Sequence, residues 1–277
     1  KVMFDGYDVG VRYADDAVGR IAHHLDALGV LDETAILVAS DHGEGFGELG
    51  VYADHQCADE VTTRIPAILR WPGLSPRVDH GLHYHLDLAA TVVDLAGGLV
   101  PERVWDGRSL APSLLSGETS GRDHLVLTQG AWTCQRGVRT ERHLYLRTWH
   151  DGYHDWPDEM LFDITADPHQ TVDLACDHPD LVTERRTLLD AWTAAQLERS
   201  GMPDPMDGVL AEGGPYHTRG HLPAYLERLR ATGRGDAAER IEARHHTEAD
   251  PRRWSALRAG ERGMLTDLMG RTEPRLL

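Results

Sequence analysis

The residues best suited to chemistry follow a short apolar run early in the sequence. Residues 34–39 read as a buried strand, and the chain then continues as Ser40-Asp41-His42-Gly43-Glu44. A carboxylate and an imidazole side by side can both bind one divalent cation. The same Asp-His-Gly sequence also suits a plain turn, in which the Asp side chain accepts hydrogen bonds from backbone amides. These residues alone leave a metal site and a turn both open.

A glycine-rich loop follows this candidate site and ends at a second histidine. Gly43 removes a side chain where a ligand would approach, and the next glycines let the loop fold back over the site. The segment Asp54-His55 stands at the far end of the loop. If the loop folds back, His55 would lie near a molecule bound to the metal. Glu44 and Glu48 are candidates for contact with the metal ligands, but loop carboxylates usually face solvent, which is what we expect of both.

The elements around the loop must hold these side chains in place. Apolar spacing predicts an amphipathic helix over residues 7–28, closed by Gly29, and a second strand at residues 65–69. Helix, turn and strand in this order are typical of half a parallel α/β repeat. In open α/β sheets, ligands lie at the carboxyl ends of the strands, where Asp41 and His42 stand.

The character of the sequence changes after about residue 120. In this later part we predict a strand at 125–127, a hairpin of 136–140 with 144–148, and turns over 162–174. A helix at 178–199, an ordered loop or arm at 201–220 and a short helix at 222–229 are expected to follow. A helix is also expected at 87–95, between the early strands and this region. We therefore predict three parts: an α/β part (1–120), an antiparallel sheet with a helix (121–200), and an extended arm with a helical tail (201–277).

Composition limits the classes of partner. The formal charge of −17 argues against nucleic acid and against an anionic membrane surface, although a local cation could still attract an anionic substrate. The apolar runs are too short for a transmembrane helix, and no signal peptide is apparent, so the sequence reads as beginning inside a fold. Three widely spaced cysteines favour a reducing compartment such as the cytoplasm.

Other candidate residues receive structural interpretations. The pairs His23-His24 and His245-His246 are expected on exposed helix faces, without a role, and Asp15-Asp16 on a solvated face. Cys57 is expected to be a small buried residue, because no base or cation stands near it in sequence.

Five segments together resemble the sulfatase family, within the alkaline-phosphatase-like superfamily. The first two are "YDVGVRYADDAVGRIAHHLDALGVLDETAILVASDHGEGFGELGVY" and "DHQCADEVTTRIPAILRWPG", and "HLDLAATVVDLAG", "DGRSLAPSLLSG" and "LFDITADPHQTVDLA" follow in the same order. The resemblance implies an α/β fold: part of an alkaline-phosphatase-like mixed sheet flanked by helices, with a small C-terminal antiparallel sheet and a helix.

The resemblance also assigns roles to three residues. In the family, the acid and the Asn or His that follow this strand bind calcium, or manganese in some relatives, which implies metal binding by Asp41 and His42. A cationic or proton-donating residue follows the glycine-rich loop and touches the sulfate and the leaving oxygen, which implies a catalytic role for His55. Oxygen ligands favour calcium, whereas a histidine ligand keeps manganese open.

The family's nucleophile motif is missing from the sequence. Sulfatases attack with a formylglycine made from the first residue of Cys/Ser-x-Pro-x-Arg, and no such motif occurs among the 277 residues. The chain therefore resembles the C-terminal portion of a sulfatase, inactive in isolation, which would act on a small-molecule sulfate ester once an upstream segment supplies the nucleophile. A phosphonate or phosphate ester hydrolase of the same superfamily, and a non-catalytic metal-binding fragment, remain alternatives. The sequence predicts neither the natural substrate nor the oligomeric state.

Overall fold

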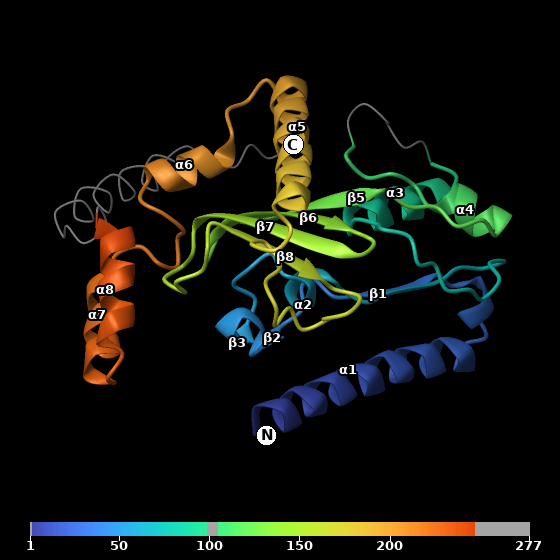
Figure 1. Cartoon of the computed structure of the whole chain (residues 1–277). Helices are drawn as coiled ribbons and strands as arrows, with labels where there is room; N and C mark the ends of the chain where they lie inside the picture. Colours follow the sequence, from blue (N-terminus) through green and yellow to red (C-terminus); the bar gives the residue numbers. More distant parts are fainter. Residues whose placement is uncertain (1, 99–104, 247–277) are drawn as a thin grey trace, which may run out of the picture.

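The chain folds into helices packed around small antiparallel sheets (Figure 1). The structure, a computed structural model, describes residues 2–98 and 105–246. Within these ranges the strands form two two-stranded sheets and one four-stranded sheet. This is the α/β class that the sequence predicted, including the C-terminal antiparallel sheet and its helix. None of the helices in these ranges is both long and apolar enough to cross a membrane.

The N-terminal elements follow the predicted order. Helix α1 (Val2–Ala27) leads through the short 3₁₀ turn η1 (Leu31–Glu33) into strand β1 (Ile36–Ala39). In the described residues β1 pairs only with β4 (Ala67–Arg70), and the pair is antiparallel. The sequence indicated half of a parallel α/β repeat at β1, but no strand lies parallel to β1 among the described residues.

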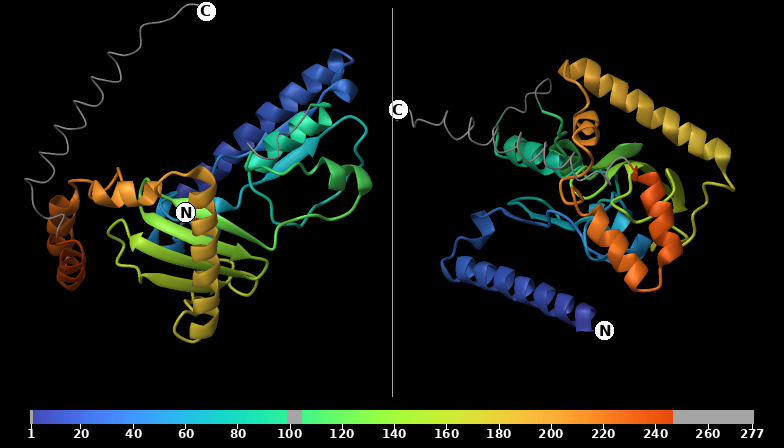
Figure 2. Two further views of the ribbon diagram at one scale, coloured as in Figure 1. Left: turned by 90° about the horizontal axis from the view of Figure 1, so that it is seen from above. Right: turned by 90° about the vertical axis from the view of Figure 1, so that its left-hand side faces the viewer.

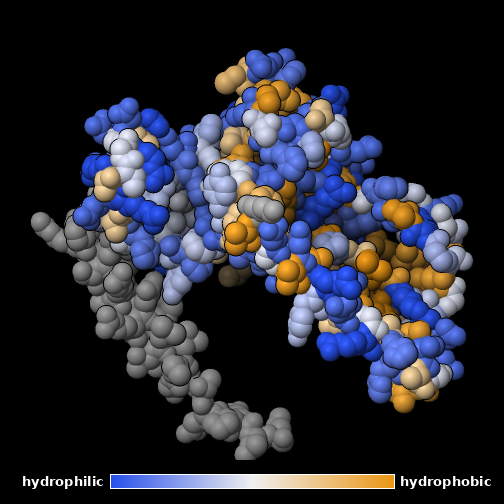
Figure 3. Space-filling view, turned by 90° about the horizontal axis from the view of Figure 1, so that it is seen from below, coloured by the Kyte–Doolittle hydropathy of each residue, from blue (hydrophilic) through white to orange (hydrophobic). Residues whose placement is uncertain are grey.

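Helix α1 lies against the edge of the molecule with its apolar side chains largely uncovered. No residue of α1 is buried, and its contact with the loop comes from Phe4 and Tyr7, whose rings lie 5.0 and 4.9 Å from that of Phe46. Hydrophobic surface gathers around a hollow on the right-hand part of the view from below (Figure 3). Exposed apolar side chains of α1 include Val9, Val11, Tyr13 and Ile21.

The glycine-rich loop closes on itself through a small hairpin. Strand β2 (Gly45–Phe46) pairs with β3 (Tyr52–Asp54), and the 3₁₀ turn η2 (Glu48–Gly50) joins them. A one-turn helix, α2 (Glu60–Thr63), follows. Gly43 lies so close to α2 that a Cβ atom there would stand 1.9 Å from the carbonyl oxygen of Val61. Only glycine fits this position without movement of the backbone, so the loop can lie directly on α2.

The four-stranded sheet forms the centre of the C-terminal half. Its strands run in the order β5 (His124–Gln129), β6 (Cys134–Thr140), β7 (His143–His150) and β8 (Glu159–Asp163), all antiparallel. The predicted hairpin is β6–β7. Strand β8 was not predicted, because only its last residues were considered and they were interpreted as the start of a turn-rich segment.

Alternate residues of this sheet belong to two separate clusters of buried side chains. Helix α5 (Pro179–Ser200), predicted at 178–199, covers one face of the sheet (Figure 2), where Leu189 packs with Tyr145 and Leu161. The other face, with Leu144, Leu146 and Phe162, packs on residues of the loop region, Val51, Cys57 and Ala58. Cys57 is therefore buried as predicted, and burial raises the pKa of its thiol. The glycine-rich loop and the sheet share one hydrophobic core.

Two short helices lie between the N-terminal region and this sheet. Helix α3 (Leu86–Leu95), predicted at 87–95, is followed by α4 (Ala111–Ser116). Asp87, buried in the first turn of α3, accepts hydrogen bonds from both Nη atoms of Arg122 and from the backbone N–H of Arg108. This pair ties α3 to the segment leading into β5.

The C-terminal arm contains more helix than the sequence indicated. Helix α6 (Pro205–Ala211) lies within the predicted loop, α7 (Leu222–Ala231) matches the predicted short helix, and α8 (Gly235–Arg244) lies within the predicted arm and helical tail, in which it had no predicted bounds. The expectation of an exposed His245 was wrong. Its side chain is 5% exposed, and Nε2 lies 2.8 Å from Oδ1 of Asp151, a residue far away in sequence.

Candidate active site

Asp41 and His42 stand at the carboxyl end of β1, as the sequence predicted. Oδ1 of Asp41 accepts a hydrogen bond from the backbone N–H of His42 at 3.0 Å, so part of the plain-turn interpretation is correct. Hydrogen bonds from the backbone N–H groups of Asp41 and His42 hold the pKa of the Asp41 carboxyl below its ordinary value. The second oxygen, Oδ2, lies 3.8 Å from Nε2 of His42.

The hydrogen bonding of His42 leaves one ring nitrogen suited to a cation. Nδ1 lies 2.9 Å from the carbonyl oxygen of Gly43, which can only accept, so Nδ1 carries the proton and the lone pair is on Nε2. Metal-binding histidines typically hold their second nitrogen in this way. A separation of 3.8 Å between Nε2 and Oδ2 of Asp41 suits two ligands of one ion. The pair therefore fits the divalent metal that the resemblance implies.

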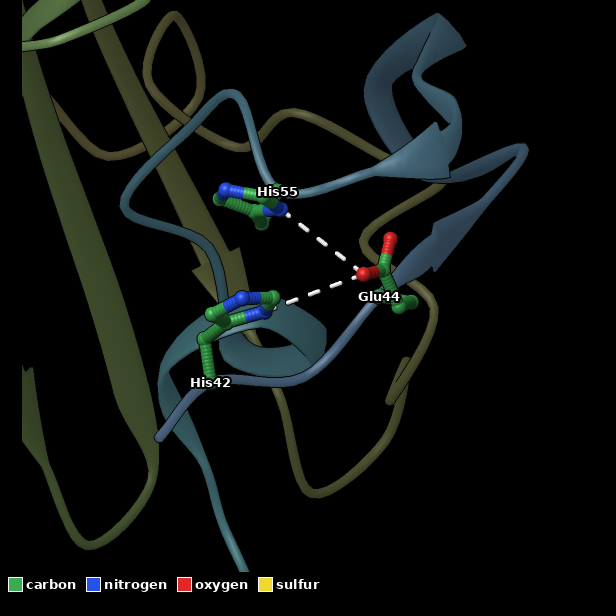
Figure 4. A group of neighbouring side chains, drawn as sticks. All are labelled: His42, Glu44 and His55. Atoms are coloured by element: carbon green, nitrogen blue, oxygen red, sulfur yellow. Dashed lines mark ion pairs between the residues drawn. The ribbon is translucent and has the colours of Figure 1, made fainter. Parts of the chain in front are cut away.

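The glycine-rich loop brings His55 directly onto His42. The two imidazole rings stack with centroids 3.8 Å apart and planes 28° apart. Figure 4 shows one nitrogen of each ring facing the carboxylate of Glu44. Oε1 of Glu44 lies 3.8 Å from Nδ1 of His42 and 3.7 Å from Nδ1 of His55. The fold thus places the predicted metal ligand and the predicted proton donor side by side.

Two polar atoms in this cluster are buried without a partner. Oε2 of Glu44 and Nδ1 of His55 accept or donate no hydrogen bond among the described residues. Orphaned buried polar atoms are costly, and their presence is typical of functional sites that await a ligand, an ion or water. The expectation that Glu44 and Glu48 face solvent was wrong. The Glu48 carboxylate accepts a hydrogen bond from the backbone N–H of Phe46 at 2.8 Å and lies 2.9 Å from Nδ1 of His169.

His42, Glu44 and His55 form a second set of possible metal ligands. One ligand atom from each lies within 4.8 Å of the others. Nδ1 of His42 lies 3.8 Å from Oε1 of Glu44, and an ion bound through this nitrogen would displace the hydrogen bond to the Gly43 carbonyl. We therefore favour the Nε2 side of His42, toward Asp41, as the metal-binding side.

The C-terminal sheet anchors the backbone at His55. Nε2 of Gln129 donates to the carbonyl oxygen of His55 at 2.9 Å, and Oγ1 of Thr133 donates to that of Gln56 at 2.9 Å. The backbone N–H of Ala58 donates to Oε1 of the buried Gln135 at 3.1 Å. Sequence analysis did not identify Gln129, Thr133 and Gln135, because the sequence around a polar side chain does not indicate which distant backbone group it contacts.

A further histidine cluster lies away from this site. His150, Asp151 and His245 are buried together, and the Asp151 carboxylate accepts from the backbone N–H groups of Tyr153 and Asp155 besides contacting His245. Burial raises the pKa of Asp151, but these hydrogen bonds outweigh burial and the net shift is downward. Through its contact with His245, Asp151 joins the C-terminal arm to the end of β7.

Comparison with known proteins assigns the family. The family model described as Sulfatase matches residues 2–99, which include β1, the glycine-rich loop, β4 and α3. Residues 2–99 therefore match the sulfatase family. Sulfatase relatives in sequence and structure support the same assignment, so the predicted resemblance is confirmed.

Three relatives show the extent of the likeness. The choline-sulfatase of Rhizobium meliloti (strain 1021) is 32% identical over 179 residues, covering 61% of this chain and 32% of that protein. The multifunctional alkaline phosphatase superfamily protein PehA of Trinickia caryophylli is 28% identical, covering 67% of this chain and 39% of that protein. The 2-O GAG sulfatase BT1596 superposes with a TM-score of 0.58 at 27% identity, covering 69% of this chain and 44% of that chain. The chain spans less than half the length of each.

Proposed function

We propose that this chain forms part of the active site of a sulfuric ester hydrolase that acts on a small-molecule sulfate ester. The observation that carries the proposal is the stacking of His55 on His42 at the carboxyl end of β1. In a sulfatase-family chain, this contact sets a candidate proton donor beside a candidate metal ligand. Because the nucleophile motif is missing, we propose that this chain supplies only the metal ligands and the proton donor of the active site.

Asp41 and His42 are proposed to hold the metal, through Oδ2 and Nε2. Calcium is our first choice because a carboxylate is a hard oxygen ligand, and manganese is the second because imidazole suits it. A bound divalent ion offsets negative charge on the sulfuryl oxygens. The hydrogen bond of His42 Nδ1 to the Gly43 carbonyl keeps Nε2 aimed at the site whether or not an ion is present.

His55 is proposed to protonate the leaving group. When the bond between sulfur and the ester oxygen breaks, the electron pair stays on that oxygen, which then takes a proton from Nε2 of His55. The hydrogen bonds from Gln129 and Thr133 hold the backbone of this segment, so the position of the imidazole is fixed before substrate binds. Proton donation of this kind accelerates reactions by about 10²- to 10⁴-fold.

The proposed reaction needs a nucleophile that is not among the residues of this sequence. We propose a formylglycine from a Cys/Ser-x-Pro-x-Arg segment, which is not among the 277 residues, and we expect no turnover from the chain alone. A phosphonate or phosphate ester hydrolase is the alternative. The likeness to PehA, whose name gives it several functions in the alkaline phosphatase superfamily, supports keeping that alternative.

Hydrolysis by the complete polypeptide tests the proposal. Rates with 4-nitrophenyl sulfate, 4-nitrophenyl phosphate and a 4-nitrophenyl phosphonate should show a higher kcat/KM for the sulfate, and the His55→Gln variant should lose most of it. A clear preference for either phosphorus ester would replace the proposal by its alternative. Metal binding without hydrolysis of any ester would favour the non-catalytic interpretation.

A further inference from the structure

We propose that Glu44 is the positioning residue of His55: its carboxylate accepts the Nδ1 proton of the imidazole and thereby presents Nε2 to the ester. The catalytic part of this inference rests on the proposed function, in which His55 donates the proton. The contact itself is a property of the folded chain and can be tested without any hydrolysis.

The geometry pairs two groups that otherwise lack partners. Oε1 of Glu44 lies 3.7 Å from Nδ1 of His55, and both that nitrogen and Oε2 of Glu44 are buried with no hydrogen bond among the described residues. Leaving such a group unpaired is costly. A small rotation of the Glu44 side chain, or one bridging water, satisfies both. Catalytic hydrogen bonds are often this long before substrate binds.

Asp54 is the nearest competing acceptor, and its oxygens are already engaged. Its Oδ1 lies 3.5 Å from Nδ1 of His55 but accepts the backbone N–H of the same residue at 2.8 Å. Its Oδ2 accepts Nε2 of Gln56 at 2.8 Å, and the Gln56 side chain is held in turn by the ring of His154 at 2.6 Å. Asp54 therefore holds the backbone and a neighbouring side chain of the loop, whereas Oε2 of Glu44 has no hydrogen-bond partner among the described residues and can turn toward the ring.

His42 does not compete for Glu44 either. Its Nδ1 lies 3.8 Å from Oε1 of Glu44 but only 2.9 Å from the Gly43 carbonyl, which accepts its proton. Because the rings of His42 and His55 stack with both Nδ1 atoms facing Glu44, their Nε2 atoms lie on the side away from it (Figure 4). The proposed proton donor thus faces the same side as the proposed metal-binding nitrogen.

This arrangement gives a balanced proton transfer. In the cationic ring, Nδ1–H is held by Glu44 and Nε2–H faces the ester. When the bond between sulfur and oxygen breaks, the Nε2 proton moves to the departing oxygen, and the ring becomes neutral with its remaining proton on Nδ1. Glu44 keeps its charge throughout, as the orienting carboxylate of a catalytic histidine generally does.

The tautomer of His55 in the chain itself tests the contact. Nitrogen-15 NMR of histidine-labelled protein, with the His55 signals assigned by their loss in His55→Gln, should show the proton on Nδ1 when the ring is neutral. In Glu44→Ala the signals should move toward the Nε2-protonated form, whereas in the matched control Asp54→Asn they should stay. An Nε2-protonated His55 in the unsubstituted chain, or the same signals in Glu44→Ala, would refute the proposal.

Metal titration separates positioning from ligation. Glu44→Gln should bind calcium and manganese within about 2-fold of the unsubstituted chain, while Asp41→Asn should weaken binding at least 10-fold. An equal loss in both variants would make Glu44 a metal ligand and the proposal wrong.

Kinetics of the complete polypeptide test the catalytic part. Glu44→Ala should lower kcat by about 10- to 100-fold with little change in KM, and Glu44→Gln, which keeps an acceptor oxygen, should recover part of the loss. An unchanged kcat in Glu44→Ala would refute the catalytic role. Absence of any hydrolysis by the unsubstituted polypeptide, with the tautomer as expected, would overturn the proposed function and leave the contact between Glu44 and His55 confirmed.

Discussion

His42 and His55 stack with ring centroids 3.8 Å apart, although one follows β1 and the other follows β3. The β2–β3 hairpin produces this contact by turning the chain back within a few residues. A predicted metal ligand and a predicted proton donor therefore meet through a local turn, before the larger C-terminal sheet adds its support.

Removing the Asp41 carboxylate should abolish metal binding with little effect on stability. The side chain is 87% exposed, so Asp41→Asn should shift the midpoint of thermal unfolding by only about 1–2 °C in the absence of metal. Calorimetric titration with calcium and manganese should show at least a 10-fold weaker affinity. Asp26→Asn, an exposed acid of α1, serves as the control for the lost charge. Unaltered affinity in Asp41→Asn would remove Asp41 from the site.

The effect of His55→Gln should depend on the leaving group. A proton donor matters most when the departing oxygen is strongly basic, so the complete polypeptide should lose about 10²-fold or more in kcat with phenyl sulfate and less with 4-nitrophenyl sulfate. Steady-state rates across a series of substituted phenyl sulfates would measure this slope. An equal loss for every leaving group would assign His55 to substrate binding instead.

Gly43→Ala should disturb the site from beneath. The added methyl group would stand 1.9 Å from the carbonyl oxygen of Val61, so either the loop or α2 must move. We expect a loss of about 2 kcal/mol in the free energy of unfolding, or roughly 5 °C in the midpoint. Gly19→Ala is the matched control: its methyl group meets nothing within 4 Å, and a helix interior gains about 1 kcal/mol from alanine. Equal melting curves for both variants would contradict the close approach.

The ion pair of Asp87 with Arg122 should make the fold sensitive to acid. Burial raises the pKa of the Asp87 carboxyl, but the hydrogen bonds from Arg122 and from two backbone N–H groups outweigh burial and leave its pKa below the ordinary value. The unfolded chain therefore binds this proton more readily than the folded chain, so the stabilisation is complete above about pH 5 and is lost as pH falls below about 4.

Asp87→Asn tests this dependence by urea unfolding across pH. The variant should lose about 3 kcal/mol near neutral pH, because Arg122 is left without its carboxylate, and the difference should shrink toward about pH 3. Asp16→Asn, which breaks only an exposed pair with Arg12, should cost less than about 1 kcal/mol. A constant difference between Asp87→Asn and the unsubstituted chain at every pH would rule out the linkage.

Local sequence signals were enough for many of the elements and for the approach of the glycine-rich loop to the end of β1. Apolar spacing gave α1, α5 and α7, and the glycines after His42 predicted a loop that folds back to place His55 beside it. The roles of Asp41, His42 and His55 remain predictions. The pairing of β1 with β4 could not be obtained in this way, since an apolar run has the same pattern in a parallel and an antiparallel pair.

Long-range partners account for the other differences. His245 looks like an exposed helical residue until its contact with Asp151 is seen, and Glu44 looks like a solvated loop acid until two histidines lie beside it. In both cases burial comes from segments that no local pattern connects. Polar residues are the hardest to place from sequence, because their partners decide whether they are buried.

The hydrogen bonds from Gln129 and Thr133 to the backbone at His55 and Gln56 limit how the chain can be recombined. A chimera could take the segment 41–58 from one sulfatase and the strands 124–150 from another. The side-chain donors of the strands would then no longer match the backbone acceptors of the loop, and the two hydrophobic surfaces would no longer fit each other. Swapping both segments together preserves the contacts. Any exchange of the segment around His55 must therefore treat two stretches, far apart in sequence, as one unit.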